Sequence, residues 1–327
     1  MVSQEKIKNL LVVVSRYVIS GLLLIYLYNQ IDVEKTAAII QSADVGYMLL
    51  AFFIFILING MILVRWIVYV RAFQIEVSWM RLTRFFSLGL FGNLFLPSAI
   101  GGDVIKTMGL CHKRGGKAKV VASVVLDRLS GFASMVIVST LAYIAGYRLL
   151  KEASLLTIIL ATAGVSGAAA FILSNERIYS YCCRVFQVFP RLQRGLMNMH
   201  YDIVLLKDRY RTNLKAVFLS SIAQTSLSFV WFLLAKSLHQ DIPLIYFLVF
   251  VPFTCFASTF PSVGGLGARE AAAVYLFAKV GVEPGISMSI SLLNYLLMVL
   301  GGVLGGALYV LMKDPVADAP AVTPHIS

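Results

Sequence analysis

Asn93-Leu-Phe-Leu-Pro-Ser-Ala-Ile-Gly-Gly-Asp-Val-Ile-Lys106 decides the fold together with a second copy of its pattern, Ala257-Ser-Thr-Phe-Pro-Ser-Val-Gly-Gly-Leu-Gly-Ala-Arg-Glu270. Each copy has an apolar approach, then Pro-Ser, a pair of glycines, and a charged residue that opens a helical pattern. Proline removes a backbone donor and glycine loosens the chain, so both stretches predict a broken helix. Two such breaks, one in each half of an apolar chain, indicate a functional centre inside a membrane.

The composition around these stretches is that of a membrane protein. Of 327 residues, 59% are hydrophobic and only 13% are charged, whereas a soluble domain carries about 25% charged residues. The long apolar runs predict an all-α, polytopic membrane helix bundle. The net charge of +12 collects in loops, which is the pattern that orients membrane proteins. We therefore expect no nucleic-acid partner, and the spacing of the four cysteines predicts neither a disulfide nor a metal site.

The apolar runs predict six full spans, at residues 10–29, 45–70, 119–146, 153–174, 214–236 and 285–312. Basic residues flank both ends of 85–110, so this stretch is predicted to be a re-entrant hairpin that enters from the cytoplasm and turns near Pro97 to Gly102. Residues 243–281 are predicted to form a second hairpin that opens from the outside. The alternative makes them two thin spans, each barely long enough to cross about 30 Å of hydrocarbon.

With the hairpins in place, the two halves predict inverted repeats of a single membrane domain, 1–314, with the site at the interface between the repeats. Repeat one is 1–150, repeat two is 151–314, and the tail 315–327 is expected to be disordered. Lys6 and Lys8 precede the first span with no cleavage site after it, which favours an uncleaved span. The protein is expected in the cytoplasmic (inner) membrane, with both termini in the cytoplasm.

A basic connector, 175–213, joins the fourth and fifth spans. Its apolar residues form one helical stripe, with charges on the opposite face. Two interpretations stay open: a helix lying on anionic membrane lipids, or a linker helix packed on the cytoplasmic end of the bundle. The stripe consists of Leu192, Leu196, Met199, Ile203, Leu206 and Tyr210.

The candidate substrate-binding residues follow from the broken helices. A helix that starts near the midplane exposes backbone N–H groups and a positive dipole end, and glycines let an anion approach them. The cations Lys106 and Arg269, which follow the two glycine pairs, can pair with a phosphate or carboxylate. The alternative is that Asp103 and Glu270 only cap the helices, and that the glycines only allow close packing of the helices. The predicted site comprises Asn93, Ser98, Gly101, Gly102, Asp103, Lys106, Asp127, Arg128, Ser262, Gly264, Gly265, Gly267, Arg269, Glu270 and Asn294.

Several other residues inside the spans have simpler interpretations. Neighbours on a helix do not face each other, so either Asp127 or Arg128 is expected to point at the first hairpin while the other snorkels. Asn294 is expected to hydrogen-bond across the bundle, and Arg65 to snorkel to the interface. The four glycines of 301–306 predict close helix packing. No nucleotide-binding loop, catalytic carboxylate pair or metal-ligand spacing is found, so neither a cofactor nor enzymatic activity is expected.

Three motifs carry a resemblance to a known family: LPSAIGGDVIKTMGL (96–110), VASVVLDRLSG (121–131) and FPSVGGLGAREAA (260–272). Together they resemble the flippase-like membrane domain of lysylphosphatidylglycerol synthases, over nearly the whole chain. The resemblance implies movement of a lipid with a polar headgroup between leaflets. Lys106 and Asn294 depart from the family pattern, which commonly has arginine at both positions. The soluble aminoacyl-transferring domain is not expected, so lipid aminoacylation is not expected either. The residues that match its motifs are Gly102, Asp103, Lys106, Asp127, Arg128, Gly264, Gly265, Gly267, Arg269 and Glu270.

The sequence thus predicts a flippase or transporter for a phospholipid-like substrate with an anionic or zwitterionic headgroup. One alternative is an intramembrane lipid-modifying transferase, which would need an acid and a base on one face. Another is a non-transporting partner of a separate lipid synthase, bound through the connector 175–213.

Overall fold

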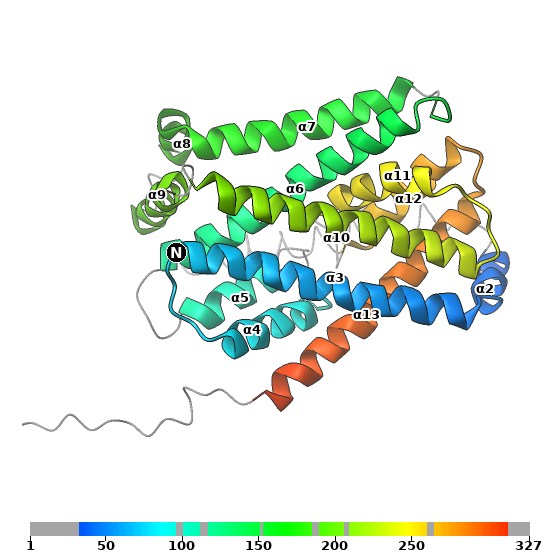
Figure 1. The fold of residues 1–327 in the computed structure, drawn as a ribbon, viewed down its shortest axis with the longest axis horizontal. Helices are drawn as coiled ribbons and strands as arrows, with labels where there is room; N and C mark the ends of the chain where they lie inside the picture. Colours follow the sequence, from blue (N-terminus) through cyan, green and yellow to red (C-terminus); the bar gives the residue numbers. More distant parts are fainter. Residues whose placement is uncertain are drawn as a thin grey trace, which may run out of the picture.

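The computed structural model describes residues 33–95, 101–111, 117–150, 153–184, 190–205, 209–259 and 265–312. Twelve helices and no strand occupy these ranges (Figure 1). The predicted first span, 10–29, lies outside the described residues. The helices are α2 (Val33–Gln41), α3 (Val45–Ala72), α4 (Trp79–Gly92), α5 (Gly101–Cys111), α6 (Lys117–Ala145), α7 (Ala153–Ser174), α8 (Glu176–Cys183), α9 (Pro190–Leu205), α10 (Tyr210–Ser237), α11 (Leu244–Ala257), α12 (Ala268–Ala278) and α13 (Pro284–Leu311).

Five helices in the described ranges are long and apolar enough to cross a membrane: α3, α6, α7, α10 and α13. They coincide with the predicted spans two to six, so these predictions are confirmed. Their boundaries follow from local sequence. The Asp44 side chain accepts the backbone N–H of Gly46 at 2.7 Å and so starts α3. Pro284 occupies the first turn of α13, where its missing N–H costs nothing.

The two broken stretches form two pairs of short helices. α4 and α11 have 14 residues each, and α5 and α12 have 11, so none is longer than about 21 Å at 1.5 Å per residue. In Figure 1, α4 and α5 lie toward the end of the bundle that carries α8 and α9, whereas α11 and α12 lie toward the opposite end, near α2. The connecting peptides, 96–100 and 260–264, lie outside the described residues. A break in each stretch is confirmed, because one helix ends before it and another begins after it.

The glycine-rich part of α13 packs closely on α4. A Cβ at Gly305 would lie 2.7 Å from the backbone oxygen of Ser87, and one at Gly306 would lie 2.7 Å from the ring of Phe91. The predicted packing role of these glycines is therefore confirmed. Small residues let the two helix backbones approach, and this contact holds the first short pair against the second half of the chain.

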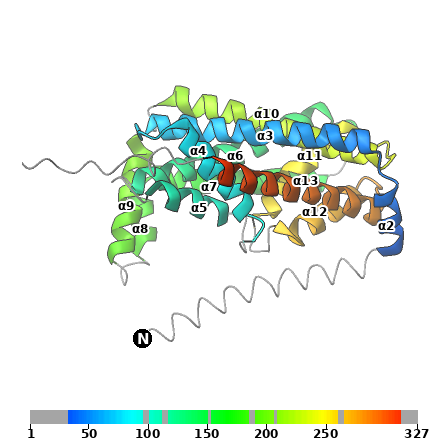
Figure 2. The same ribbon diagram turned by 90° about the horizontal axis from the view of Figure 1, so that it is seen from below.

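The connector forms two helices, α8 and α9, which cross one end of the bundle (Figure 2). Met199 and Ile203 of the apolar stripe are buried with Ala122 of α6 and Tyr179 of α8. Burial raises the pKa of Tyr179 to about 12, as expected for a dry contact. Leu196, Met199 and Ile203 therefore pack on the bundle, as the linker interpretation predicts, whereas Tyr210 at the start of α10 is 64% exposed. The side chains of Leu192 and Leu206 are not among those that the structure describes.

Candidate functional site

A cavity of about 320 Å³ lies between the two pairs of short helices. The first pair contributes Asn93 and Lys106 to its wall, and the second pair contributes Ser258 and Arg269. Long helices α3, α6, α10 and α13 complete the wall. The two stretches that share a sequence pattern therefore face the same space, although more than 150 positions separate them.

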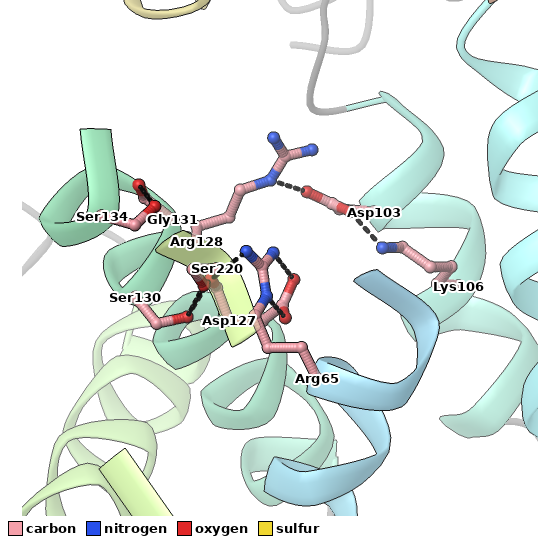
Figure 3. A network of polar contacts seen from close by, with 9 residues as sticks. All are labelled: Arg65, Asp103, Lys106, Asp127, Arg128, Ser130, Gly131, Ser134 and Ser220. Atoms are coloured by element: carbon pink, nitrogen blue, oxygen red, sulfur yellow. Dashed lines mark hydrogen bonds and ion pairs between the residues drawn. The ribbon is translucent and has the colours of Figure 1, made fainter. Parts of the chain in front are cut away.

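The first charged cluster is centred on Asp103, in the first turn of α5 (Figure 3). Its Oδ1 lies 2.6 Å from Lys106 Nζ, and its Oδ2 accepts a hydrogen bond of 2.5 Å from Arg128 Nε on α6. Lys106 Nζ also lies 5.2 Å from the ring centre of Trp66, which adds a cation–π contact. Asp103 and Lys106 are buried, whereas the Arg128 side chain stays 39% exposed. Asp103 thus links α5 of the first short pair to α6. The Arg128 guanidinium group that it binds stays partly exposed at the cavity wall.

The second cluster pairs Asp127 of α6 with Arg65 of α3, so α6 takes part in both clusters (Figure 3). Arg65 donates from Nε to Asp127 Oδ1 at 2.6 Å and from Nη2 to Oδ2 at 2.9 Å, which is the two-pronged geometry that arginine favours. Its Nη1 donates to Ser220 Oγ at 2.8 Å. Arg65 is only 8% exposed, so the prediction that it snorkels is wrong. A charge inside an apolar run usually faces the protein interior, and this signal should have placed Arg65 in the site.

The side chains of Asp127 and Arg128 point toward different helices. Of the two predicted orientations, one toward the first hairpin and one toward the interface, only the first is observed. Arg128 points at the first short pair, through Asp103. Asp127 does not snorkel; it is 3% exposed and bound to Arg65. Consecutive helical residues are about 100° apart around the axis, so one pair of neighbours supplies charges to two different helices.

The third cluster lies at the start of α12. Gly267 has φ of +90°, a conformation that favours glycine, and its N–H donates to Glu270 Oε2 at 2.7 Å. The capping role that was weighed for Glu270 is thus confirmed. Glu270 Oε1 also accepts from Arg269 Nε at 3.1 Å and from Ser291 Oγ at 3.1 Å. Arg269 lies 5.4 Å from the ring centre of Tyr295. Both charged residues are buried, and Arg269 reaches the cavity wall.

Asn93 and Gly102 join the ends of the first pair. The Gly102 N–H donates to Asn93 Oδ1 at 2.8 Å, so this amide is used within the protein. A Cβ at Gly102 would lie 2.2 Å from the backbone oxygen of Gly89. The packing interpretation therefore holds for Gly102, and Asn93 has a structural role as well as a place on the cavity wall.

Asn294 makes no hydrogen bond to another of the described helices, contrary to its predicted role. Its Nδ2 lies 3.9 Å from the sulfur of Met298 on the same helix, and its Oδ1 is buried without a hydrogen-bond partner among the described residues. The residue nevertheless lines the cavity.

The cavity thus collects much of the predicted site. Those of its predicted residues that line the cavity are Asn93, Asp103, Lys106, Asp127, Arg128, Arg269 and Asn294. Described but absent from the wall are Gly101, Gly102, Gly265, Gly267 and Glu270. Ser98, Ser262 and Gly264 lie outside the described residues. Sequence reasoning missed Arg65, Ser220, Gln224 and Tyr295. Four cations and three carboxylates make up the three clusters, an excess of one positive charge.

Comparison with known proteins identifies the family of the chain. Residues 13–306 match the family model described as the lysylphosphatidylglycerol synthase TM region. The UPF0104 membrane protein PH1989 of Pyrococcus horikoshii is 25% identical over 294 residues, which cover 81% of this chain and 86% of that protein. No solved structure matches the sequence significantly. The chain is thus a multi-pass membrane protein that belongs to the family of the lysylphosphatidylglycerol synthase TM region.

Proposed function

We propose that this protein moves a lipid with a phosphate-bearing headgroup between the leaflets of the cytoplasmic membrane. The headgroup crosses through the central cavity while the acyl chains stay in the bilayer. One observation carries the proposal: both pairs of short helices contribute cations to a single cavity of about 320 Å³. This volume falls in the range of small-molecule sites, roughly 300–1,000 Å³, and suits a headgroup better than a whole lipid.

The proposed topology is a bundle of six spans with two re-entrant hairpins related as inverted repeats. Each of the four helices α4, α5, α11 and α12 is too short to cross about 30 Å of hydrocarbon by itself. The pair α4–α5 and the pair α11–α12 lie toward opposite ends of the bundle (Figure 1). Inverted repeats place a substrate site where the two repeats meet. The basic connector then lies at the cytoplasmic surface, where its charged face can contact anionic lipids or a separate lipid synthase.

Phosphate is favoured over a cationic headgroup by the charge balance. The carboxylates Asp103, Asp127 and Glu270 each bind a cation of the protein, so an added ammonium group would compete with arginine. A phosphate instead gains from the excess positive charge, and guanidinium groups suit its geometry. Arg128 has the most exposed side chain among these cations, at 39%, and we assign it the first contact with the headgroup.

The test is lipid exchange in liposomes that contain phosphatidylglycerol labelled with NBD on an acyl chain. Dithionite bleaches only the outer leaflet unless the protein brings inner-leaflet lipid to the surface. Arg128→Gln should slow this exchange by about tenfold or more, because one charge-assisted hydrogen bond contributes about 1.5–3 kcal/mol. Lys106 still neutralises Asp103 in this variant, so the fold should persist.

The matched control is Arg148→Gln, the same chemical change at an exposed residue after α6 and away from the cavity wall. It should exchange lipid at the wild-type rate. Wild-type exchange by Arg128→Gln, or no protein-dependent exchange at all, would contradict the proposal.

A further inference from the structure

A basic surface lies outside the cavity, at the end of the bundle that carries α8 and α9 (Figure 1). Arg71 in the last turn of α3 and two arginines of α4, Arg81 and Arg84, surround the first two turns of α4. Residues 71–95 contain these three arginines and one carboxylate, Glu76, which is an excess of two positive charges. The described residues that line the cavity do not include the three arginines. Their charge is therefore separate from that of the cavity.

Two of these arginines lie over aromatic rings that other parts of the bundle supply. The guanidinium carbon of Arg71 lies 5.9 Å from the ring centre of Trp79. That of Arg84 lies 4.7 Å from the ring centre of Tyr309 on α13. A ring holds a guanidinium group by its face and leaves the N–H donors at its edge free to meet an anion. The two contacts thus orient the cations without neutralising them.

The donors of Arg71 and Arg81 are little used within the protein. Arg71 donates to the backbone oxygen of Val77 at 3.1 Å, and Arg81 donates to that of Gly109 at 3.4 Å. Within the described ranges neither forms an ion pair with a carboxylate, whereas each arginine of the three cavity clusters does. Arg71 is exposed and Arg81 is half-buried. An arginine has five N–H donors, so both keep donors for the oxygens of an external anion.

The surface lies at the level of the membrane interface. Arg71 and Tyr309 belong to the last turns of α3 and α13, two of the helices long enough to cross a membrane. Apolar side chains are exposed beside the arginines: Trp79 and Met80 on α4, and Met108 in the last turn of α5. Tryptophan is typical of this interface. A small soluble anion would leave these apolar side chains uncovered, whereas a phospholipid brings both an acidic headgroup and acyl chains.

We propose that this surface binds an anionic phospholipid of the surrounding bilayer. Its phosphate lies among Arg71, Arg81 and Arg84, and an acyl chain covers the exposed apolar side chains. The bound lipid joins the ends of α3 and α13 to α4, and it is distinct from the lipid that the cavity is proposed to move. One basic residue near an anionic lipid surface favours binding by about fivefold, so the surface selects anionic over zwitterionic lipids.

Tryptophan fluorescence reports which lipid lies at this surface. The chain has three tryptophans; Trp79 is 57% exposed, whereas Trp66 and Trp231 are 0% and 1% exposed. The protein is reconstituted in vesicles of equal amounts of phosphatidylcholine and phosphatidylglycerol, and one of the two lipids carries bromine, a short-range quencher, on its acyl chains. Quenching that persists in Trp79→Phe comes from the buried tryptophans and is subtracted. We expect phosphatidylglycerol to lie beside Trp79 about fivefold more often than phosphatidylcholine.

A double variant and its control test the arginines. Arg81→Gln/Arg84→Gln removes two of the three charges and leaves Arg71 on Trp79, so the preference should fall toward one. Arg148→Gln, the same change at an exposed residue after α6, should keep the wild-type preference. A salt series needs no variant: at about 1 M salt the Debye length is only about 3 Å, and the preference of the wild-type protein should be lost.

Equal quenching of Trp79 by the two brominated lipids in the wild-type protein overturns the inference. So does quenching by neither lipid, which would show that protein covers this face. An undiminished preference in the folded double variant, or one that survives high salt, also overturns it. If the double variant does not fold, the salt series decides. None of these results bears on the proposed function, because lipid exchange through the cavity is measured separately.

Discussion

Asp127 and Arg128 are neighbours in the sequence, yet they hold different helices. Asp127 binds Arg65 on α3, and Arg128 binds Asp103 on α5. Each contact joins α6 to another helix through a charged pair in an apolar bundle. Because a buried charge without a partner is costly, these pairs fix which helices lie side by side, whatever they contribute to net stability.

The Arg65–Asp127 pair allows a test of stability that is separate from transport. Arg65→Met should lower the free energy of unfolding by about 3–5 kcal/mol, because it leaves the Asp127 carboxylate buried and uncompensated. The double variant Arg65→Met/Asp127→Leu should recover most of this loss, since no lone charge remains. Thermal unfolding in detergent measures both.

The control for this pair is Arg148→Met, at an exposed position, which should melt as the wild type does. If Arg65→Met and the double variant melt at the same lowered temperature, the loss comes from packing and the charge argument is wrong.

The sequence predicted which residues belong to the candidate site better than it predicted which of them contact each other. Asp103, Lys106 and Arg269 were placed in the candidate site because they follow the two Pro-Ser-Gly breaks, and Asp127 because it matches a motif of the family. Arg65 was missed because it lies in the last third of α3, where long basic side chains commonly reach the interface. Its partner is 62 positions away, and no periodicity within one helix encodes such a contact.

At the scale of the helices, the packing of α4 against α5 depends on glycines, which have no side chain to keep the two backbones apart. α4 and α5 meet where Gly89 and Gly102 touch, and Asn93 closes the turn by accepting the Gly102 N–H. The sequence predicted the break from Pro-Ser-Gly-Gly, which is local chemistry. It did not predict the Asn93 contact, which forms only when the two helices come together.

Gly102→Ala should therefore destabilise the protein, by about 1–3 kcal/mol as in other overpacked sites. The new methyl group would lie 2.2 Å from the backbone oxygen of Gly89 and 2.7 Å from Asn93 Oδ1, so the two helices must separate. Thermal unfolding and hydrogen exchange of α4 and α5 measure the effect.

Gly60→Ala in α3 is the matched control, because nothing lies within 4 Å of its added Cβ. Alanine favours a helix over glycine, so this variant should be as stable as wild type or more stable. A Gly102→Ala protein with unchanged melting and unchanged exchange in α4 and α5 would show that this contact does not hold the pair.

At the scale of the whole molecule, one cavity is shared by two halves of the chain. Five of the six predicted spans fall on described residues, and all five are helices long and apolar enough to cross a membrane. The meeting of the two broken stretches at one cavity was a hypothesis drawn from their shared pattern, and the cavity wall now contains residues of both. The alternative in which 243–281 forms two thin spans was harder to separate by sequence, because both layouts return the chain to the same side.

The two layouts differ in where the turn between α11 and α12 lies, and this can be measured by cysteine labelling. In a variant whose four native cysteines are serine, Glu76→Cys before α4 and Asp241→Cys before α11 should react with an impermeant maleimide from opposite faces of sealed vesicles. Thr259→Cys, just after α11 on the cavity wall, should react far more slowly than either from both faces, because a re-entrant hairpin buries its turn near the middle of the bundle. Two thin spans would instead bring Thr259 to the same surface as Glu76, so fast labelling of Thr259→Cys from that face would refute the hairpin. Labelling of Glu76→Cys and Asp241→Cys from one face would refute the inverted arrangement of the two halves.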